Sequence, residues 1–175
     1  MKRSYANRGQ AFEMAINFVN QQYKNMGVAL INKRPTPVKV FKTRGRDILK
    51  AQWEAKSTVD YDGVYKGKAI AFEAKSVGEK RFDLDLLKAH QLQYLIDAEK
   101  NGAISFVLIE FRNHHLIFYC PVSFIAHYVK AAETGGRKSI PIADFEVYAY
   151  EVERGRQVTL DYLAVIDHLQ EKQAL

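Results

Sequence analysis

The sequence predicts one mixed α/β domain, because helical and strand-like segments alternate along 175 residues without a repeat or a low-complexity linker. Hydrophobic residues make up 47% of the chain and charged residues 26%, which is the ordinary composition of a soluble globular protein. Apolar runs such as residues 104–109 are too short to span a membrane. Residues 1–5 lack the apolar segment of a signal peptide, and Cys120 has no cysteine partner, so we expect an intracellular protein without disulfides.

The first segment, from about residue 4 to residue 25, predicts a helix that ends at Gly27. Its apolar residues recur at helical spacing: Phe12, Ile16, Val19 and Tyr23. Residues 28–31 then predict a short strand. Asp62-Gly63 and residues 66–68 are turn signals that predict a hairpin, whose following strand covers residues 69–75. Because side chains alternate along a strand, Glu73 and Lys75 share one face of it.

The second half predicts further helices and strands around a buried central strand. A helix over residues 84–100 carries a stripe of Leu84, Leu87, Gln91, Leu95 and Ala98. Residues 103–111 are almost continuously apolar, which suits a strand covered on both faces. A strand over residues 115–120, a helix over 121–134, a late strand over 145–152 and a helix over 160–169 complete the order.

The net charge of +6 arises in one stretch. Residues 32–56 hold two acidic residues and eight basic ones: Lys33, Arg34, Lys39, Lys42, Arg44, Arg46, Lys50 and Lys56. Because this stretch fits no buried element, we expect it to project from the domain. Concentrated positive charge is typical of a protein that binds a phosphate backbone. A solvated basic loop without a partner is the alternative.

Asp60, Glu73 and Lys75 are the candidate catalytic residues. An acid at the end of one strand and Glu-x-Lys on its hairpin partner can bring three side chains to one point. Two carboxylates are hard oxygen ligands suited to Mg²⁺ or Mn²⁺, and a lysine can stabilise the charge that develops on a cleaved phosphodiester. The pattern alone is weak, and an exposed glutamate and lysine on an edge strand are the alternative.

Several segments together resemble the RecU family of Holliday-junction resolvases. They are, in order, Asn7-Arg8-Gly9 with Glu13, residues 33–37, residues 57–68 continuing into Phe72-Glu73-Ala74-Lys75, His90-Gln91, and Asp161-Tyr162-Leu163 with Ile166-Asp167. The resemblance covers nearly the whole chain. It implies a restriction-endonuclease-like fold of the PD-(D/E)xK nucleases, with a mixed sheet flanked by helices. It also implies a homodimer in which a basic stalk, about residues 42–56, projects between two active sites.

The resemblance further implies roles for individual residues. The metal site would consist of Thr58, Asp60, Glu73 and Gln91, whereas Lys75 would stabilise the transition state. Asp62 is an alternative ligand, but its place before Gly63 suits a turn. A buried structural glutamine is the alternative for Gln91.

Other residues carry two interpretations each. Glu13 is either a supporting catalytic acid or an ordinary carboxylate of the first helix. Arg8 contacts DNA or pairs locally, and Trp53 stacks on a base or anchors the stalk. The expected DNA contacts on the stalk are Lys42, Arg44, Arg46 and Lys50.

The expected function is therefore a Mg²⁺-dependent endonuclease, with Mn²⁺ as a substitute, that resolves four-way DNA junctions by symmetric phosphodiester cleavage in recombination and DNA repair. We expect it in the cytoplasm at the nucleoid, encoded by a bacterium or a phage, with a recombinase or a branch-migration helicase as candidate partner. One alternative is a nuclease for plain duplex DNA. The other is a junction-binding or strand-annealing protein with a weak catalytic site.

Overall fold

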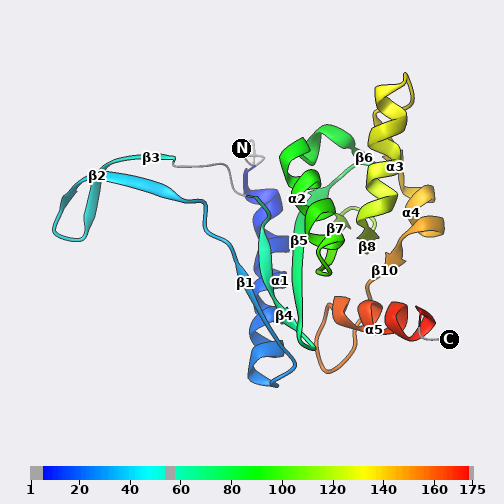
Figure 1. The fold of residues 1–175 in the computed structure, drawn as a ribbon, viewed down its shortest axis with the longest axis horizontal. Coiled ribbons are helices and arrows are strands. Elements are labelled where there is room, and N and C mark those ends of the chain that lie inside the picture. The colour runs from blue at the N-terminus through cyan, green and yellow to red at the C-terminus, as the bar shows by residue number, and fades with distance from the viewer. Residues whose placement is uncertain (1–5, 54–57, 174–175) are drawn as a thin grey trace.

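A computed structural model describes residues 6–53 and 58–173, which form a six-stranded mixed sheet with helices on both faces (Figure 1). The strand order is β1 (Ala29–Lys33), β4 (Tyr61–Tyr65), β5 (Lys68–Val77), β7 (Ile104–Phe111), β8 (Leu116–Pro121) and β10 (Tyr150–Glu151). Only β5 and β7 pair in parallel within this sheet, and its other neighbouring strands are antiparallel. The predicted mixed α/β class is confirmed.

The helices divide between the two faces of the sheet. They are α1 (Ala6–Asn25), α2 (Ala89–Lys100), α3 (Val122–Glu133), α4 (Ile142–Tyr148) and α5 (Tyr162–Gln173). Helices α1 and α5 pack on one face, whereas α2, α3 and α4 pack on the other. A short 3-10 helix (Leu84–Leu86) precedes α2, and a small two-stranded sheet joins β6 (Arg81–Asp83) to β9 (Ser139–Pro141). None of the helices in the described ranges is long and apolar enough to cross a membrane.

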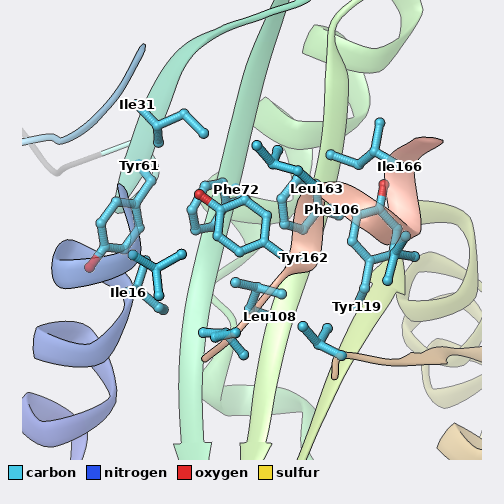
Figure 2. Packing of buried hydrophobic residues seen from close by; sticks show 14 of the residues in the cluster. Ile16, Ile31, Tyr61, Phe72, Phe106, Leu108, Tyr119, Tyr162, Leu163 and Ile166 are labelled. Carbon is cyan, nitrogen blue, oxygen red and sulfur yellow. The ribbon is translucent and has the colours of Figure 1, made fainter. Parts of the chain in front are cut away.

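A row of aromatic rings runs across the face covered by α1 and α5 (Figure 2). Tyr61 of β4 stacks on Phe72 of β5, and Phe72 stacks on Phe106 of β7, each with 4.7 Å between ring centroids. Phe106 in turn stacks on Tyr119 of β8 at 4.3 Å, and Tyr162 of α5 covers the row. These rings hold four neighbouring strands in register, since stacked aromatic pairs stabilise beyond the area they bury.

The basic stretch forms a hairpin that projects from the sheet, as Figure 1 shows. Strands β2 (Val38–Arg44) and β3 (Asp47–Trp53) pair with each other and with no strand of the main sheet. Residues 38–52 are exposed along their whole length. The predicted projection is confirmed, and we call residues 38–53 the stalk. It begins earlier than the expected residue 42, and residues 54–57, including Lys56, lie outside the described ranges.

The turn expected at Asp62-Gly63 is wrong, because both residues lie inside β4. The second predicted signal is confirmed, because the hairpin turns at Lys66 and Gly67, which both have positive φ. A side chain at position 63 would clash with the neighbouring strand, because a Cβ atom there would lie 2.0 Å from the carbonyl oxygen of Leu30. Glycine inside a strand commonly marks such a close approach.

Two further expectations need correction. The helix expected over residues 84–100 is interrupted at Leu87 and Lys88, and α2 begins only at Ala89. The late strand expected over residues 145–152 is wrong, since residues 142–148 form α4 and only Tyr150–Glu151 pair with β8. Phe145 of α4 is fully buried among aromatic rings from β7, β8 and α3.

Candidate active site

Asp60 and Glu73 meet on the face of the sheet that α2 covers. Asp60 lies just before β4, and its backbone N–H donates to Oε2 of Glu73 at 3.1 Å. The backbone N–H of Ala74 donates in return to Oδ2 of Asp60 at 3.2 Å. The alternation along β5 separates the core residues Phe72 and Ala74 from Glu73, as the sequence predicted. The hairpin therefore fixes the two carboxylates beside each other.

Glu73 is the most constrained residue of this group. Its side chain is fully buried, and Oε1 accepts hydrogen bonds from Nζ of Lys75 and Nε2 of Gln91, both at 2.5 Å. Burial raises the pKa of Glu73 to about 7, Lys75 opposes that rise and the nearby carboxylate of Asp60 adds to it. A buried, charged glutamate next to an aspartate is costly unless a cation compensates it.

Gln91 reaches the site from the first turn of α2. It contacts Glu73 through its amide nitrogen, while its carbonyl oxygen accepts from the backbone N–H of Lys88 at 3.0 Å and so caps the helix. The same side chain thus contacts the site and stabilises the start of α2. The buried polar position that the sequence singled out is real, and its amide oxygen faces the helix backbone in this arrangement.

Thr58 and Arg34 form the edge of the site next to the stalk. The Thr58 hydroxyl accepts a hydrogen bond from Nη1 of Arg34 at 2.8 Å. Nε of Arg34 lies 3.2 Å from Oδ2 of Asp62, so Asp62 is engaged by this arginine. The sequence placed Arg34 in the basic stretch and in the matched segment at residues 33–37, without a role of its own. The available signal was its place immediately before the two prolines at residues 35 and 37.

Glu13 lies on the other side of the sheet, on α1. Its carboxylate is ion-paired with Lys33, and its backbone carbonyl accepts from the Tyr61 hydroxyl at 3.3 Å. The structure therefore does not place Glu13 in the cluster of Asp60, Glu73, Lys75 and Gln91. The side chains of Arg8 and Trp53, for which DNA contacts were considered, lie outside the described part of the chain.

The strand register divides the stalk into two unlike faces. One face carries Lys39, Lys42, Arg44 and Lys50 together with Gln52 and Asp47, so it is positive in sum, and the opposite face carries Val38, Val40, Thr43, Ile48 and Ala51. Bulges at residues 41 and 49 keep this division along the hairpin. Lys42 stands directly opposite Lys50, and facing like charges destabilise a strand pair. Arg46 is exposed in the connecting turn. The four expected contact residues are thus all accessible, and the basic face suits a polyanion.

The site fits a hard divalent cation, with few protein ligands. Within the described ranges no group of three His, Cys, Asp or Glu side chains could hold a metal ion. Asp60 and Glu73 supply two carboxylates, so neutral oxygens and water would have to complete the coordination, which is usual for Mg²⁺. Among the residues that the structure describes, Lys75 pairs with Glu73 only, so a divalent cation beside the pair would also compensate the neighbouring carboxylate of Asp60.

The matched segment near the C-terminus stabilises the fold. Asp161 is buried, accepts from the Tyr23 hydroxyl at 2.9 Å and caps α5 through the N–H of Ala164 at 3.1 Å. Asp167 is ion-paired with Arg156 and with Lys66 of the β4–β5 turn. These contacts tie α5 to the end of the sheet away from Asp60 and Glu73.

The structure combines a mixed sheet, Asp…Glu-x-Lys on one of its faces and a projecting basic hairpin, which is the arrangement that the resemblance to RecU leads us to expect. The family model described as "Recombination protein U" matches residues 7–168. The chain therefore belongs to the RecU family.

Named relatives cover nearly the whole chain. A protein of Geobacillus kaustophilus is 35% identical over 94% of this chain and 86% of its own length. A protein of Pediococcus pentosaceus is 35% identical over 94% and 85%, and one of Streptococcus suis is 34% identical over 94% and 82%. Each is named Holliday junction resolvase RecU. The solved Hjc resolvase of Archaeoglobus fulgidus overlaps 79% of this chain and 94% of its own at 14% identity and a TM-score of 0.47, a likeness too weak to carry an inference.

Proposed function

We propose that this protein is a Mg²⁺-dependent endonuclease that resolves four-way DNA junctions by symmetric phosphodiester cleavage as a homodimer, in recombination and repair. The observation that carries the proposal is the buried Glu73, joined to Asp60 and Lys75 at the base of an exposed basic stalk. The relatives named as Holliday junction resolvases support the choice of substrate.

The residues of the site divide the chemical work among them. Asp60 and Glu73 would hold the metal ion, with Thr58 and Gln91 as neutral neighbours. When bound, Mg²⁺ polarises the phosphodiester and lowers the pKa of a coordinated water. The ammonium of Lys75 is partly exposed and 2.5 Å from Glu73. It can leave that carboxylate and donate to the charge that develops on the phosphate oxygens.

The stalk accounts for both the DNA and the second subunit. Its basic face, with Lys42, Arg44 and Lys50, would contact phosphates at the open centre of a junction. A two-stranded hairpin alone is marginally stable in water, so the apolar face with Val40 and Ile48 requires cover. Two copies that bury this face against each other would turn both basic faces outward and set two equivalent sites across a two-fold axis.

Replacement of Glu73 separates cleavage from binding. Glu73→Gln keeps the size of the buried side chain and removes its charge, so we expect junction cleavage to fall by about 1000-fold or more. Junction affinity, measured by gel shift in EDTA, should stay within about twofold because the stalk is unchanged. Glu79→Gln, at an exposed glutamate outside the site, is the matched control. Equal cleavage by the Glu73→Gln and wild-type proteins would refute the assignment.

A further inference from the structure

Arg34 lies where the chain leaves the sheet for the stalk, and Thr58 lies where the chain returns. The backbone N–H of Arg34 donates to the carbonyl oxygen of Asp60 at 2.8 Å. Its guanidinium donates through Nη1 to the hydroxyl of Thr58, also at 2.8 Å. Arg34, on the outgoing leg, therefore binds the returning leg at two points, on either side of the fully buried Val59.

The same guanidinium reaches two further elements. Nε lies 3.2 Å from Oδ2 of Asp62 on β4, and Nη1 donates to the Tyr94 hydroxyl on α2 at 3.3 Å. The charged carbon also lies 5.9 Å from the centre of the Tyr94 ring. Tyr94 is one helical turn beyond Gln91, which contacts Glu73. Arg34 thus connects the stalk with both elements that surround the cluster of Asp60 and Glu73.

We infer that Arg34 is a positioning residue that fixes the stalk relative to the metal site, an inference that rests on the proposed function. Its backbone holds Asp60, and its side chain holds the neighbouring Thr58 and Asp62. The distance from the DNA-binding stalk to the cleaved phosphate then depends on this clamp. A planar guanidinium can serve three partners in fixed directions, which the compact ammonium of lysine cannot reproduce.

A direct bond to a DNA phosphate is the competing role, since 37% of the Arg34 side chain is exposed. The two roles differ in their salt dependence. A variant that binds one phosphate fewer has a slope of log affinity against log salt that is smaller by about 0.9. Removal of a clamp whose donors serve protein groups leaves that slope unchanged and acts on metal affinity and on the position of the cut.

The test compares wild type, Arg34→Ala and Arg34→Lys, with Arg81→Ala as the control. Arg81 is an exposed arginine paired with Asp83 at 3.0 Å and lies outside the site. Cut positions are mapped on a synthetic four-way junction, Mn²⁺ affinity is measured by calorimetry without DNA, and junction affinity is measured in EDTA at several salt concentrations.

For Arg34→Ala we expect Mn²⁺ affinity to fall by about tenfold or more, as is usual when a residue that supports a metal ligand is removed. We also expect cuts at several neighbouring phosphodiesters in place of the wild-type positions, an unchanged salt slope, and little rescue by Arg34→Lys. Tyr94→Phe, which removes one hydroxyl, should show the same changes to a smaller degree. It replaces Arg34→Ala in the test if the Arg34→Ala protein unfolds at the assay temperature.

Wild-type Mn²⁺ affinity and cut positions in folded Arg34→Ala would overturn the inference, as would a salt slope smaller by about 0.9. A wild-type protein that fails to cut the junction would instead overturn the proposed function, so the two failures are distinguishable.

Discussion

Glu73 shows what a single residue contributes to this fold. Its carboxylate is fully buried beside Asp60, at a cost that Lys75 and Gln91 only partly offset, and its pKa is raised to about 7. Perturbed carboxylates gather at catalytic sites more often than elsewhere, and this tendency favours the proposed role of Glu73.

Asp167 provides a contrasting carboxylate that only stabilises the fold. Burial tends to raise its pKa, but hydrogen bonds from Lys66 and Tyr65 and the charge of Arg156 prevail and lower it. Because the folded pKa lies below the unfolded one, the native state gains stability above the unfolded pKa of about 3.9 and loses it as pH falls through the folded pKa.

We therefore expect Asp167→Asn to lower the free energy of unfolding by about 2 kcal/mol at pH 7, as for other hydrogen bonds to charged groups. The deficit should shrink as pH falls below about 4, because the carboxyl of the unfolded wild-type chain is protonated there, before that of the folded protein. Urea unfolding at pH 7 and pH 3 measures it. A deficit of the same size at both pH values would contradict the assigned role.

At the level of elements, the sequence predicted a helix or strand correctly where the pattern of apolar residues is compatible with only one type of element. The aligned apolar residues of α1, the continuous run of β7 and the alternation of Glu73 and Lys75 on β5 all predicted their elements. It failed at Gly63, because a glycine required by the carbonyl of Leu30 is indistinguishable in sequence from a turn glycine. It also failed over residues 145–152, where residues 142–148 form a helix that buries Phe145.

The site shows the same division. Asp60, Glu73 and Lys75 could be predicted, because hairpin pairing follows from local sequence. Arg34 could not be assigned to the site, because its contacts to Thr58, Asp62 and Tyr94 depend on the path of the stalk and on the packing of α2.

The stalk predicts a graded weakening of DNA binding. Lys42→Ala and Lys50→Ala should each reduce junction affinity and lower the slope of log affinity against log salt by about 0.9 for each phosphate that the variant no longer binds. Lys130→Ala, at an exposed lysine of α3, should leave the slope unchanged. Titrations of a fluorescent junction in EDTA at three salt concentrations measure this. An unchanged slope in both stalk variants would exclude the basic face from DNA binding.

For the whole molecule, the stalk is the segment whose apolar side chains are left exposed, because they do not pack against the main sheet or its helices. Ile48 is 58% exposed and Val40 is 41% exposed on the apolar face of the hairpin. The opposite face is positive in sum, so two stalks repel each other less when they approach through the apolar face. The proposed dimer follows from this asymmetry of a single hairpin.

We expect Ile48→Asp to raise the dissociation constant of the dimer by at least about tenfold, because a charge would be buried at the interface. Leu86→Asp, at a residue 41% exposed on the short helix before α2, is the matched control and should leave the dimer intact. Analytical ultracentrifugation measures both. A dimer of wild-type strength in Ile48→Asp would show that the subunits meet elsewhere.

The most direct test of junction resolution by this protein is the cleavage of a four-way junction labelled on two like strands, with a linear duplex of the same sequence beside it. We expect nicks at matching positions in both labelled strands of the junction, dependent on Mg²⁺, abolished by EDTA and absent from the duplex. Tight binding of the junction without nicks in Mg²⁺ or Mn²⁺, or equal cutting of the duplex, would contradict it.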